Sequence, residues 1–305
     1  MTTTVRRLTG LKPSGELHLG NLLGAIQPMV RDQYTSDSVL FLADLHALTV
    51  AHRSRSLRET TLRQATVLLA AGLDPDRTLF YVQSQVPDHA ELHYLLHRTT
   101  VYAEAPVLQA AGILLHDATE VPAGADQREH VALTREIATR FNQRYGATFV
   151  VPDVVTPPVG ARVNDLANPT VKMGKTTSSA SGAIGLLDPP SLVVHKINRA
   201  VTDSETTIGY DPALRPGVSN LLEILAACVG GSPATVATGL RGYGELRRAT
   251  AEAVLGLLRP VQAAYGTLAR DPGYVRRLLA EGAEQARART ADTVFRAKRA
   301  IGVLT

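Results

Sequence analysis

The sequence has one cysteine, few aromatic residues and no long apolar run. A single cysteine, Cys228, among 305 residues excludes an intrachain disulfide and a cysteine-rich metal site. No stretch approaches the roughly 18 consecutive apolar residues of a membrane-spanning helix, and no apolar run follows the basic residues near the start. We therefore expect a cytoplasmic protein with no membrane segment and no metal held by the protein itself.

The composition is that of a globular protein, with 45% hydrophobic and 20% charged residues. Its length allows one large or two ordinary domains. The net charge of +4 is unevenly placed, because residues 231–305 hold 12 Arg and Lys against 6 Asp and Glu, which is +6 and leaves −2 for residues 1–230. A basic half suggests a polyanionic partner, but a solvated helical face would give the same pattern, and charge alone leaves both open.

The first part of the chain alternates between strand and helix patterns. Apolar spacing and turn residues predict, in order, strand 5–11, helix 18–32, strand 38–45, helix 56–71 and strand 78–83. This order is typical of a parallel sheet with helices on both faces and a ligand crevice at the carboxyl ends of the strands. His18 follows the first strand and is therefore expected at that crevice.

After residue 190 the patterns are helical throughout. We expect helices over 191–201, 218–229, 235–242, 243–268 with a break at Arg259-Pro260, 272–281 and 283–301. The predicted fold class is α/β, with a Rossmann-like catalytic domain over residues 1–185 and an all-helical domain over residues 186–305. The boundary follows the Gly/Ser/Thr/Ala-rich stretch 174–185.

Two short segments together indicate nucleotide binding. The first is His18-Leu19-Gly20-Asn21, and the second is Lys172-Met173-Gly174-Lys175 followed by Thr and Ser residues. A helix start with imidazole, glycine and amide groups can hold phosphates through N–H donors and the helix dipole. A loop with two lysines can close over the same phosphates. The sequence therefore predicts an ATP site shared by the two segments.

These segments resemble the HIGH-type and KMSKS-type motifs of class I aminoacyl-tRNA synthetases, and most closely those of the tryptophanyl-tRNA synthetases. Gly174 stands where the family usually has serine. Further similar segments, in the same order along the chain, are 10–21, Asp44-Leu45-His46-Ala47, 121–127, Arg140-Phe141-Asn142 and 200–205. The resemblance covers nearly the whole chain and implies a tryptophan–tRNA ligase whose helical domain reads the anticodon.

The resemblance also implies the site residues. ATP would be bound, with Mg²⁺ as its companion, by Lys12, Ser14, His18, Gly20, Asn21, Asp126, Gln127, Lys172, Met173, Lys175 and Thr176. Catalysis would rest on His18, Lys172 and Lys175, the two lysines stabilising the charge that develops on pyrophosphate as the amino acid carboxylate attacks the α-phosphate. The amino acid would contact Leu8, His46, Gln109, Gly112, Val121, Ala123 and Gln127. Implied partners are tRNA, tryptophan and a second copy of the chain as a homodimer.

Each assignment has a structural alternative. His18 could cap a helix, Lys172 and Lys175 could solvate a turn, and His46 could be a hydrogen-bonded core histidine. Asp126 and Gln127 could cap a helix that begins near Gln127. The flanking Gly, Ser and Asn residues and the family match favour the functional interpretation in each case.

The sequence departs from the family around the amino acid pocket. A segment that carries an ATP-contacting lysine and part of the dimer interface in the family has no counterpart between Glu104 and Ala105. Gly112 stands where bacterial members have the aspartate that accepts the indole N–H. Ala105 replaces a tyrosine and Leu8 replaces a phenylalanine.

A buried indole N–H without an acceptor would cost about 1 to 3 kcal/mol. Gln109, one helical turn before Gly112, could supply that acceptor or could merely line the pocket, and both interpretations stay open. Two functions follow: the tryptophan–tRNA ligase, and a synthetase-like paralogue that takes another substrate or only binds nucleotide or RNA.

Overall fold

The protein is built on a five-stranded parallel sheet with the strand order β3-β2-β1-β4-β5. The computed structural model describes residues 5–49, 54–123, 127–155, 163–175, 179–205 and 207–304. The strands are β1 (Arg6–Leu11), β2 (Asp37–Leu42), β3 (Thr78–Val82), β4 (Glu120–Pro122) and β5 (Asp153–Val155). From β1 the chain first moves outward to β2 and β3 and then crosses to β4 and β5 on the other side. This reversal creates the crevice typical of Rossmann-like folds, and the predicted fold class is confirmed.

Helices connect the strands and cover the sheet. Those of the first part are α1 (Leu19–Asn21), the π-helical turn η1 (Leu22–Ile26), α2 (Gln27–Asp32), α3 (Asp44–Ala47), α4 (Ser54–Ala70), the 3-10 turn η2 (Gln83–Gln85), α5 (Asp88–Thr99), α6 (Glu104–Leu114) and α7 (Arg128–Tyr145). The second part holds α8 (Pro190–Asn198), α9 (Pro216–Val229), α10 (Pro233–Ala237), α11 (Tyr243–Leu268) and α12 (Pro272–Ile301). Every described element after residue 185 is a helix, as predicted.

The two faces of the sheet are buried in different clusters, because side chains alternate along a strand. Leu40, Leu42, Phe80 and Val82 join a large cluster that also contains residues of α4, α8, α9 and α11. Val39, Phe41, Leu79 and Tyr81, one position away in each case, join a second cluster on the opposite face. The large cluster crosses residue 185, so the sheet and the helical part share one core; the domain boundary itself stays a prediction.

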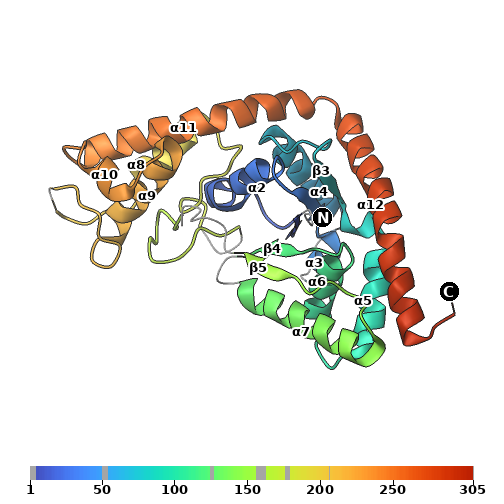
Figure 1. The fold of residues 1–305 in the computed structure, drawn as a ribbon. Helices are drawn as coiled ribbons and strands as arrows, with labels where there is room; N and C mark the ends of the chain where they lie inside the picture. The colour runs from blue at the N-terminus through green and yellow to red at the C-terminus, as the bar shows by residue number, and fades with distance from the viewer. Residues whose placement is uncertain are drawn as a thin grey trace.

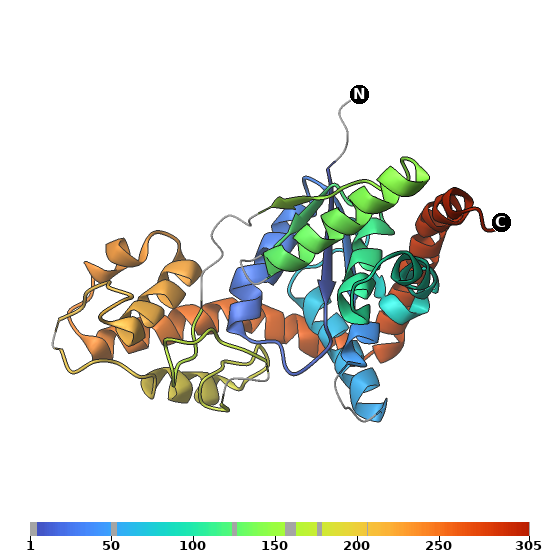
Figure 2. The same cartoon turned by 90° about the horizontal axis from the view of Figure 1, so that it is seen from below.

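Figure 1 shows α8, α9 and α10 grouped at one end of the molecule, with α11 leading away from them to α12 beside β3. Seen from below in Figure 2, this helical group and α12 lie on opposite sides of the sheet. The last helix thus returns to the first part of the chain.

Two expected helix breaks are wrong. Helix α11 continues through Pro260, which has no N–H to donate and would clash with the carbonyl of residue 256 in a straight helix. Gly256 occupies that position and both residues are exposed, so the turn can tilt and leave its free carbonyl to water. Helix α12 likewise continues through Gly282, because this glycine lies against β3: a Cβ there would stand 1.9 Å from the Phe80 carbonyl oxygen.

The strand predicted over 38–45 ends at Leu42, and the residues that follow form the short helix α3. The Asp44 carboxylate accepts hydrogen bonds from the Ser84 N–H at 2.9 Å and from the Ser84 hydroxyl at 2.5 Å. These bonds tie the end of β2 to the end of β3. They hold the neighbouring His46 at the carboxyl edge of the sheet.

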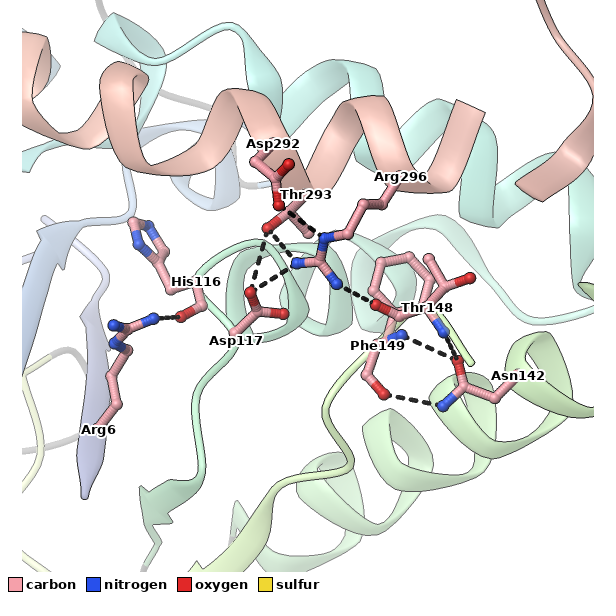
Figure 3. A network of polar contacts seen from close by, with 9 residues as sticks. All are labelled: Arg6, His116, Asp117, Asn142, Thr148, Phe149, Asp292, Thr293 and Arg296. Atoms are coloured by element: carbon pink, nitrogen blue, oxygen red, sulfur yellow. Dashed lines mark hydrogen bonds and ion pairs between the residues drawn. The ribbon is translucent and has the colours of Figure 1, made fainter. Parts of the chain in front are cut away.

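Polar contacts fasten α12 to the first part of the chain (Figure 3). Arg296 donates to Asp117 Oδ2 at 2.6 Å and also to the carbonyl of Thr148. Asn142 Oδ1 accepts from the N–H groups of Thr148 at 3.0 Å and Phe149 at 2.9 Å, which fixes the turn that Arg296 reaches. Asn142, part of one family-like segment, therefore has a structural role here.

Candidate active site

The His18 turn begins the first helix after β1, at the crevice edge of the sheet. His18 is extended, and its backbone N–H donates to Asn21 Oδ1 at 3.1 Å. The N–H of Leu19 donates to the Ile184 carbonyl at 2.8 Å, so this donor is already used within the protein. The His18 ring is only 5% exposed, and its Nδ1 has no hydrogen-bond partner among the described residues. Its imidazole is therefore positioned at the helix start with one polar atom uncommitted.

The lysine loop lies directly against the loop that precedes His18. Lys175 Nζ donates to the Lys12 carbonyl at 3.1 Å. Gly15 has a φ of +63°, and a Cβ at this position would stand 2.8 Å from the Lys175 carbonyl oxygen. Glycine is required there both by the backbone conformation and by the close approach. The structure thus brings together the two segments that the sequence assigned to ATP.

The base of the lysine loop is held by buried contacts. Met173 is buried in the large core cluster, and its N–H donates to the Val163 carbonyl at 3.1 Å. Asn220 of α9 exchanges two hydrogen bonds with the backbone of Asn164, at 2.9 and 3.0 Å. The helical part therefore helps to position the loop that carries Lys175.

Burial lowers the pKa values of two basic side chains near the crevice, Lys175 and His18. It lowers the pKa of the Lys175 ammonium to about 8, because a charged amine loses hydration there. It also lowers the pKa of His18 to about 4, and the nearby charges of Lys175 and Lys172 act in the same direction. At neutral pH His18 is uncharged and Lys175 is charged, but close to its titration range.

The remaining residues assigned to ATP are spread around these two loops. Lys12 Nζ donates to the Thr49 hydroxyl at 3.1 Å, and the Ser14 N–H donates to the Lys12 carbonyl at 2.9 Å. Lys172 is exposed and pairs through a β-bridge with Asn164. Gly20 lies beside His18, and a Cβ on Gly20 would stand 3.2 Å from the His18 ring. Asp126 and Thr176 lie outside the described residues.

Several residues assigned to the amino acid belong to one buried apolar cluster. Leu8 of β1, Val121 of β4 and Ala123 lie in the same cluster as Phe41 and Tyr81. Gly112 of α6 faces this group, because a Cβ on it would meet Phe41 Cζ at 3.1 Å and the His89 ring at 3.7 Å. Four of the residues predicted for the pocket therefore lie in or against the cluster that contains Phe41.

Three further residues assigned to the amino acid have different surroundings. His46 is half-buried in α3, and burial lowers the pKa of its imidazole to about 4, with Lys12 contributing. Gln109 is half-buried on α6, and its side chain makes no hydrogen bond within the part of the chain that the structure describes. Gln127 is exposed and stands at the N-cap position of α7, where its side chain makes no capping hydrogen bond.

The sequence pattern did not predict the buried polar triad that lies next to Gly112. The Tyr81 hydroxyl lies 2.7 Å from His89 Nε2 and 2.6 Å from His116 Nε2, and the His89 ring packs on Phe41 with 4.9 Å between ring centroids. The three residues come from β3, the start of α5 and the turn after α6. Their spacing in sequence is irregular, so only the folded chain brings them together.

The segment 200–205, another family-like motif, stabilises the helical part. Asp203 pairs with Arg215 at 2.8 Å and accepts from the Tyr243 hydroxyl. The hydrogen bond from Arg215, with that from Tyr243, lowers the pKa of the Asp203 carboxyl to about 2. This segment therefore links the start of α9 to the start of α11.

Neither a metal-binding cluster nor a membrane helix is found in the described ranges. No group of three or more His, Cys, Asp or Glu side chains among those residues could hold a metal ion. None of the described helices is both long and apolar enough to span a membrane.

A parallel sheet that reverses its order at β1, with a histidine-glycine turn and a lysine loop at the reversal, defines a nucleotide-binding α/β protein. The family model described as tRNA synthetases class I (W and Y) matches residues 1–105 and 101–259. A "Tryptophan--tRNA ligase 1" of Streptomyces coelicolor is 47% identical, with 98% of this chain and 97% of the relative covered. One of Streptomyces avermitilis is 46% identical, with 98% and 99% covered.

Solved structures are similar over the same length. A tryptophanyl-tRNA synthetase from Mycoplasma pneumoniae superposes with a TM-score of 0.91 at 30% identity, covering 99% of this chain and 98% of the other. One from Campylobacter jejuni, complexed with ADP and tryptophan, gives 0.81 at 29% identity, covering 98% and 100%. The chain belongs to the class I tRNA synthetases for tryptophan and tyrosine, and within them to the tryptophanyl-tRNA synthetases.

The comparisons also bear on the segment without a counterpart. The two matches to the family model meet at residues 101–105, where the sequence predicted the gap. The alignment with the S. coelicolor protein spans 327 positions against 305 residues in this chain, so the relative has residues with no equivalent here. In the structure α5 ends at Thr99 and α6 begins at Glu104, which leaves a short connection at this point.

Proposed function

We propose that this chain is a tryptophan–tRNA ligase, which activates tryptophan with ATP and transfers it to tRNA. The observation that supports this most strongly is the docking of the lysine loop on the His18 turn, with Lys175 Nζ 3.1 Å from the Lys12 carbonyl, in a chain similar over its whole length to such ligases. The hydrogen-bond donors of both segments lie at the edge of the sheet where a class I synthetase is expected to bind its nucleotide.

The chemistry requires charge stabilisation rather than proton removal. The tryptophan carboxylate is already ionised near neutral pH, so it can attack the α-phosphate without a general base. Lys175 and Lys172 stabilise the negative charge that moves onto pyrophosphate, while the neutral His18 ring and Asn21 bind phosphate oxygens. Gly20 has no side chain, which would let the adenine lie flat against the backbone. Asp126, Gln127, Met173 and Thr176 complete the ATP site in this proposal.

The remaining parts of the proposal concern partners. Mg²⁺ accompanies ATP and neutralises its phosphates, held by those phosphates rather than by a cluster of protein ligands. The basic helical part contacts tRNA, and the protein acts as a homodimer in the cytoplasm. His46, Gln109, Leu8, Val121 and Ala123 line the tryptophan pocket.

Pyrophosphate exchange measured with each protein amino acid tests this function. Exchange that requires tryptophan, followed by charging of tRNA, is the expected result. Because the chain contains no tryptophan, the fluorescence of added tryptophan measures its binding without a protein background. Exchange with another amino acid, or with none, would favour the paralogue in which activation is redirected or lost.

A further inference from the structure

One buried polar atom with no partner borders the apolar cluster on the proposed amino acid side. His89 is 0% exposed, and its Nδ1 has no hydrogen bond in the described part of the chain. This atom lies 3.7 Å from the Cβ position of Gly112, the residue that lacks a side chain in this pocket. An unpaired polar atom in such surroundings is unfavourable unless a ligand supplies its partner.

The surroundings restrict what that ligand can be. Leu8, Val121 and Ala123 are apolar and buried, and Phe41 packs on the His89 ring at 4.9 Å. Such a wall accepts a flat apolar group and offers it one polar contact. The indole ring of tryptophan carries one N–H donor and no acceptor, so it needs a single acceptor in an apolar pocket.

The buried triad determines whether Nδ1 can accept. Burial raises the pKa of Tyr81 and lowers those of His89 and His116, so all three groups are neutral near pH 7. The Tyr81 oxygen contacts both Nε2 atoms but carries only one proton. One contact therefore uses the hydroxyl proton and the other uses an imidazole proton. When Tyr81 donates to His116 and accepts from His89 Nε2–H, the Nδ1 of His89 is left bare as an acceptor.

Resting on the proposed function, we infer that His89 Nδ1 accepts the indole N–H of tryptophan and is a specificity-determining residue of this enzyme. Gly112 has no side-chain atom beside the buried ring nitrogen, and the arrangement in which Tyr81 donates to His116 leaves Nδ1 able to accept. Gln109, the acceptor considered from the sequence, then lines the pocket without taking this hydrogen bond.

The test compares tryptophan with benzothienylalanine, in which sulfur replaces the N–H in a ring of nearly the same shape. The measured quantity is the ratio of kcat/KM for the two amino acids in pyrophosphate exchange. The wild type should prefer tryptophan, and His89→Phe should reduce this ratio by about 5- to 150-fold, because only the substrate with the N–H loses a hydrogen bond. A general loss of activity lowers both values and leaves the ratio unchanged.

Gln109→Leu is the matched control, and its ratio should stay within about twofold of the wild type. A collapse of the ratio in Gln109→Leu with none in His89→Phe would assign the acceptor to Gln109 and overturn the inference. An unchanged ratio in both variants would also overturn it. A wild type that exchanges with another amino acid and not with tryptophan would refute the proposed function, and the inference with it.

A measurement on the wild type avoids any variant that fails to fold. In ¹⁵N NMR of imidazole-labelled protein, the Nδ1 signal of His89 should be that of a bare nitrogen and should shift when tryptophan binds. Benzothienylalanine should bind without this shift. A protonated Nδ1 in the tryptophan complex would contradict the inference.

Discussion

The proposed nucleotide side and the proposed amino acid side of the crevice are built in different ways. On the nucleotide side, backbone approaches decide the geometry: Gly15 lies under the Lys175 carbonyl, and the Lys12 carbonyl receives the Lys175 ammonium. On the amino acid side, buried side chains decide it: Phe41, His89 and Tyr81 pack together beside Gly112. Changes on the first side should alter the rate for every amino acid equally, whereas changes on the second should alter the choice among them.

The largest expected effect is that of Lys175→Ala. Removal of one preorganised cation should slow adenylate formation by about 10²-fold or more, with a smaller change in ATP binding, because its charge matters most in the transition state. Single-turnover kinetics with tryptophan and benzothienylalanine measure both effects, and the preference between the two substrates should not change.

Lys298→Ala is the control for Lys175→Ala. Lys298 on α12 pairs with Glu91 at 2.9 Å, so this variant removes an ammonium group outside the crevice. Its rate should equal that of the wild type. An unchanged rate in Lys175→Ala would show that the nucleotide side does not depend on this lysine.

The pH dependence of kcat/KM for ATP gives a further test of the nucleotide side. Burial lowers the pKa of Lys175 to about 8. Since the charged form is the active one, kcat/KM for ATP should fall about tenfold per pH unit above pH 8 in the free enzyme. Bound phosphates favour the ammonium, so kcat should fall only at higher pH. Lys175→Arg should remove the decline, and its persistence there would assign the titration to another group.

The lowered pKa of Lys175 affects stability in the opposite direction: raising the pH lowers activity but increases the free energy of unfolding. The unfolded chain holds the Lys175 proton up to a pKa of about 10.4. The folded state therefore carries a penalty at and below pH 8 that disappears as the pH rises toward that value. The free energy of unfolding of the wild type, relative to Lys175→Met, should increase across this window.

Two glycines provide a matched pair across the crevice. A Cβ on Gly20 would meet the His18 ring at 3.2 Å, and one on Gly112 would meet Phe41 at 3.1 Å. Each alanine variant forces a neighbour to move, at a cost of about 1.4 kcal/mol or a factor of ten. Gly20→Ala should raise KM for ATP and Gly112→Ala should raise KM for tryptophan, each with little effect on the other. Equal effects on both constants would mean that the two sides are not independent.

The smallest expected effect concerns tRNA. Arg248 on α11 is exposed and has only ion pairs of 3.9 to 4.0 Å, whereas Arg247 is engaged by the Ala200 carbonyl and the Thr202 hydroxyl. Arg248→Gln should reduce the slope of log affinity against log salt by roughly 0.7 to 0.9, if this helix contacts phosphate. Arg55→Gln, which removes a similar exposed i,i+4 pair from α4, should leave the slope unchanged. Equal slopes in both would favour a solvated helical face.

The difference between the two sides also explains what the sequence could predict. Strands such as Thr78–Val82 follow local patterns, and the meeting of the lysine loop with the loop before His18 follows from two short motifs, so one sequence contains both signals. The contact of His89 with Tyr81 and His116 depends on where three separate elements pack, and no local spacing encodes it. The helix break predicted at Gly282 was wrong because the sequence alone does not distinguish a glycine that permits close packing from one that ends a helix.

The return of α12 to the sheet has a consequence for how the protein is made. Val275, Ala283 and Val294 of this helix lie in three different core clusters, and Arg287 reaches the Gln85 carbonyl 202 residues earlier in the chain. At a synthesis rate of about 5 to 20 residues per second, a ribosome needs about 10 to 40 s to produce the intervening residues. During that time the nascent sheet exposes the surface of β3 that α12 later covers. Chaperones that recognise apolar strands would bind in this interval, because α12 covers β3 only after it has left the ribosome.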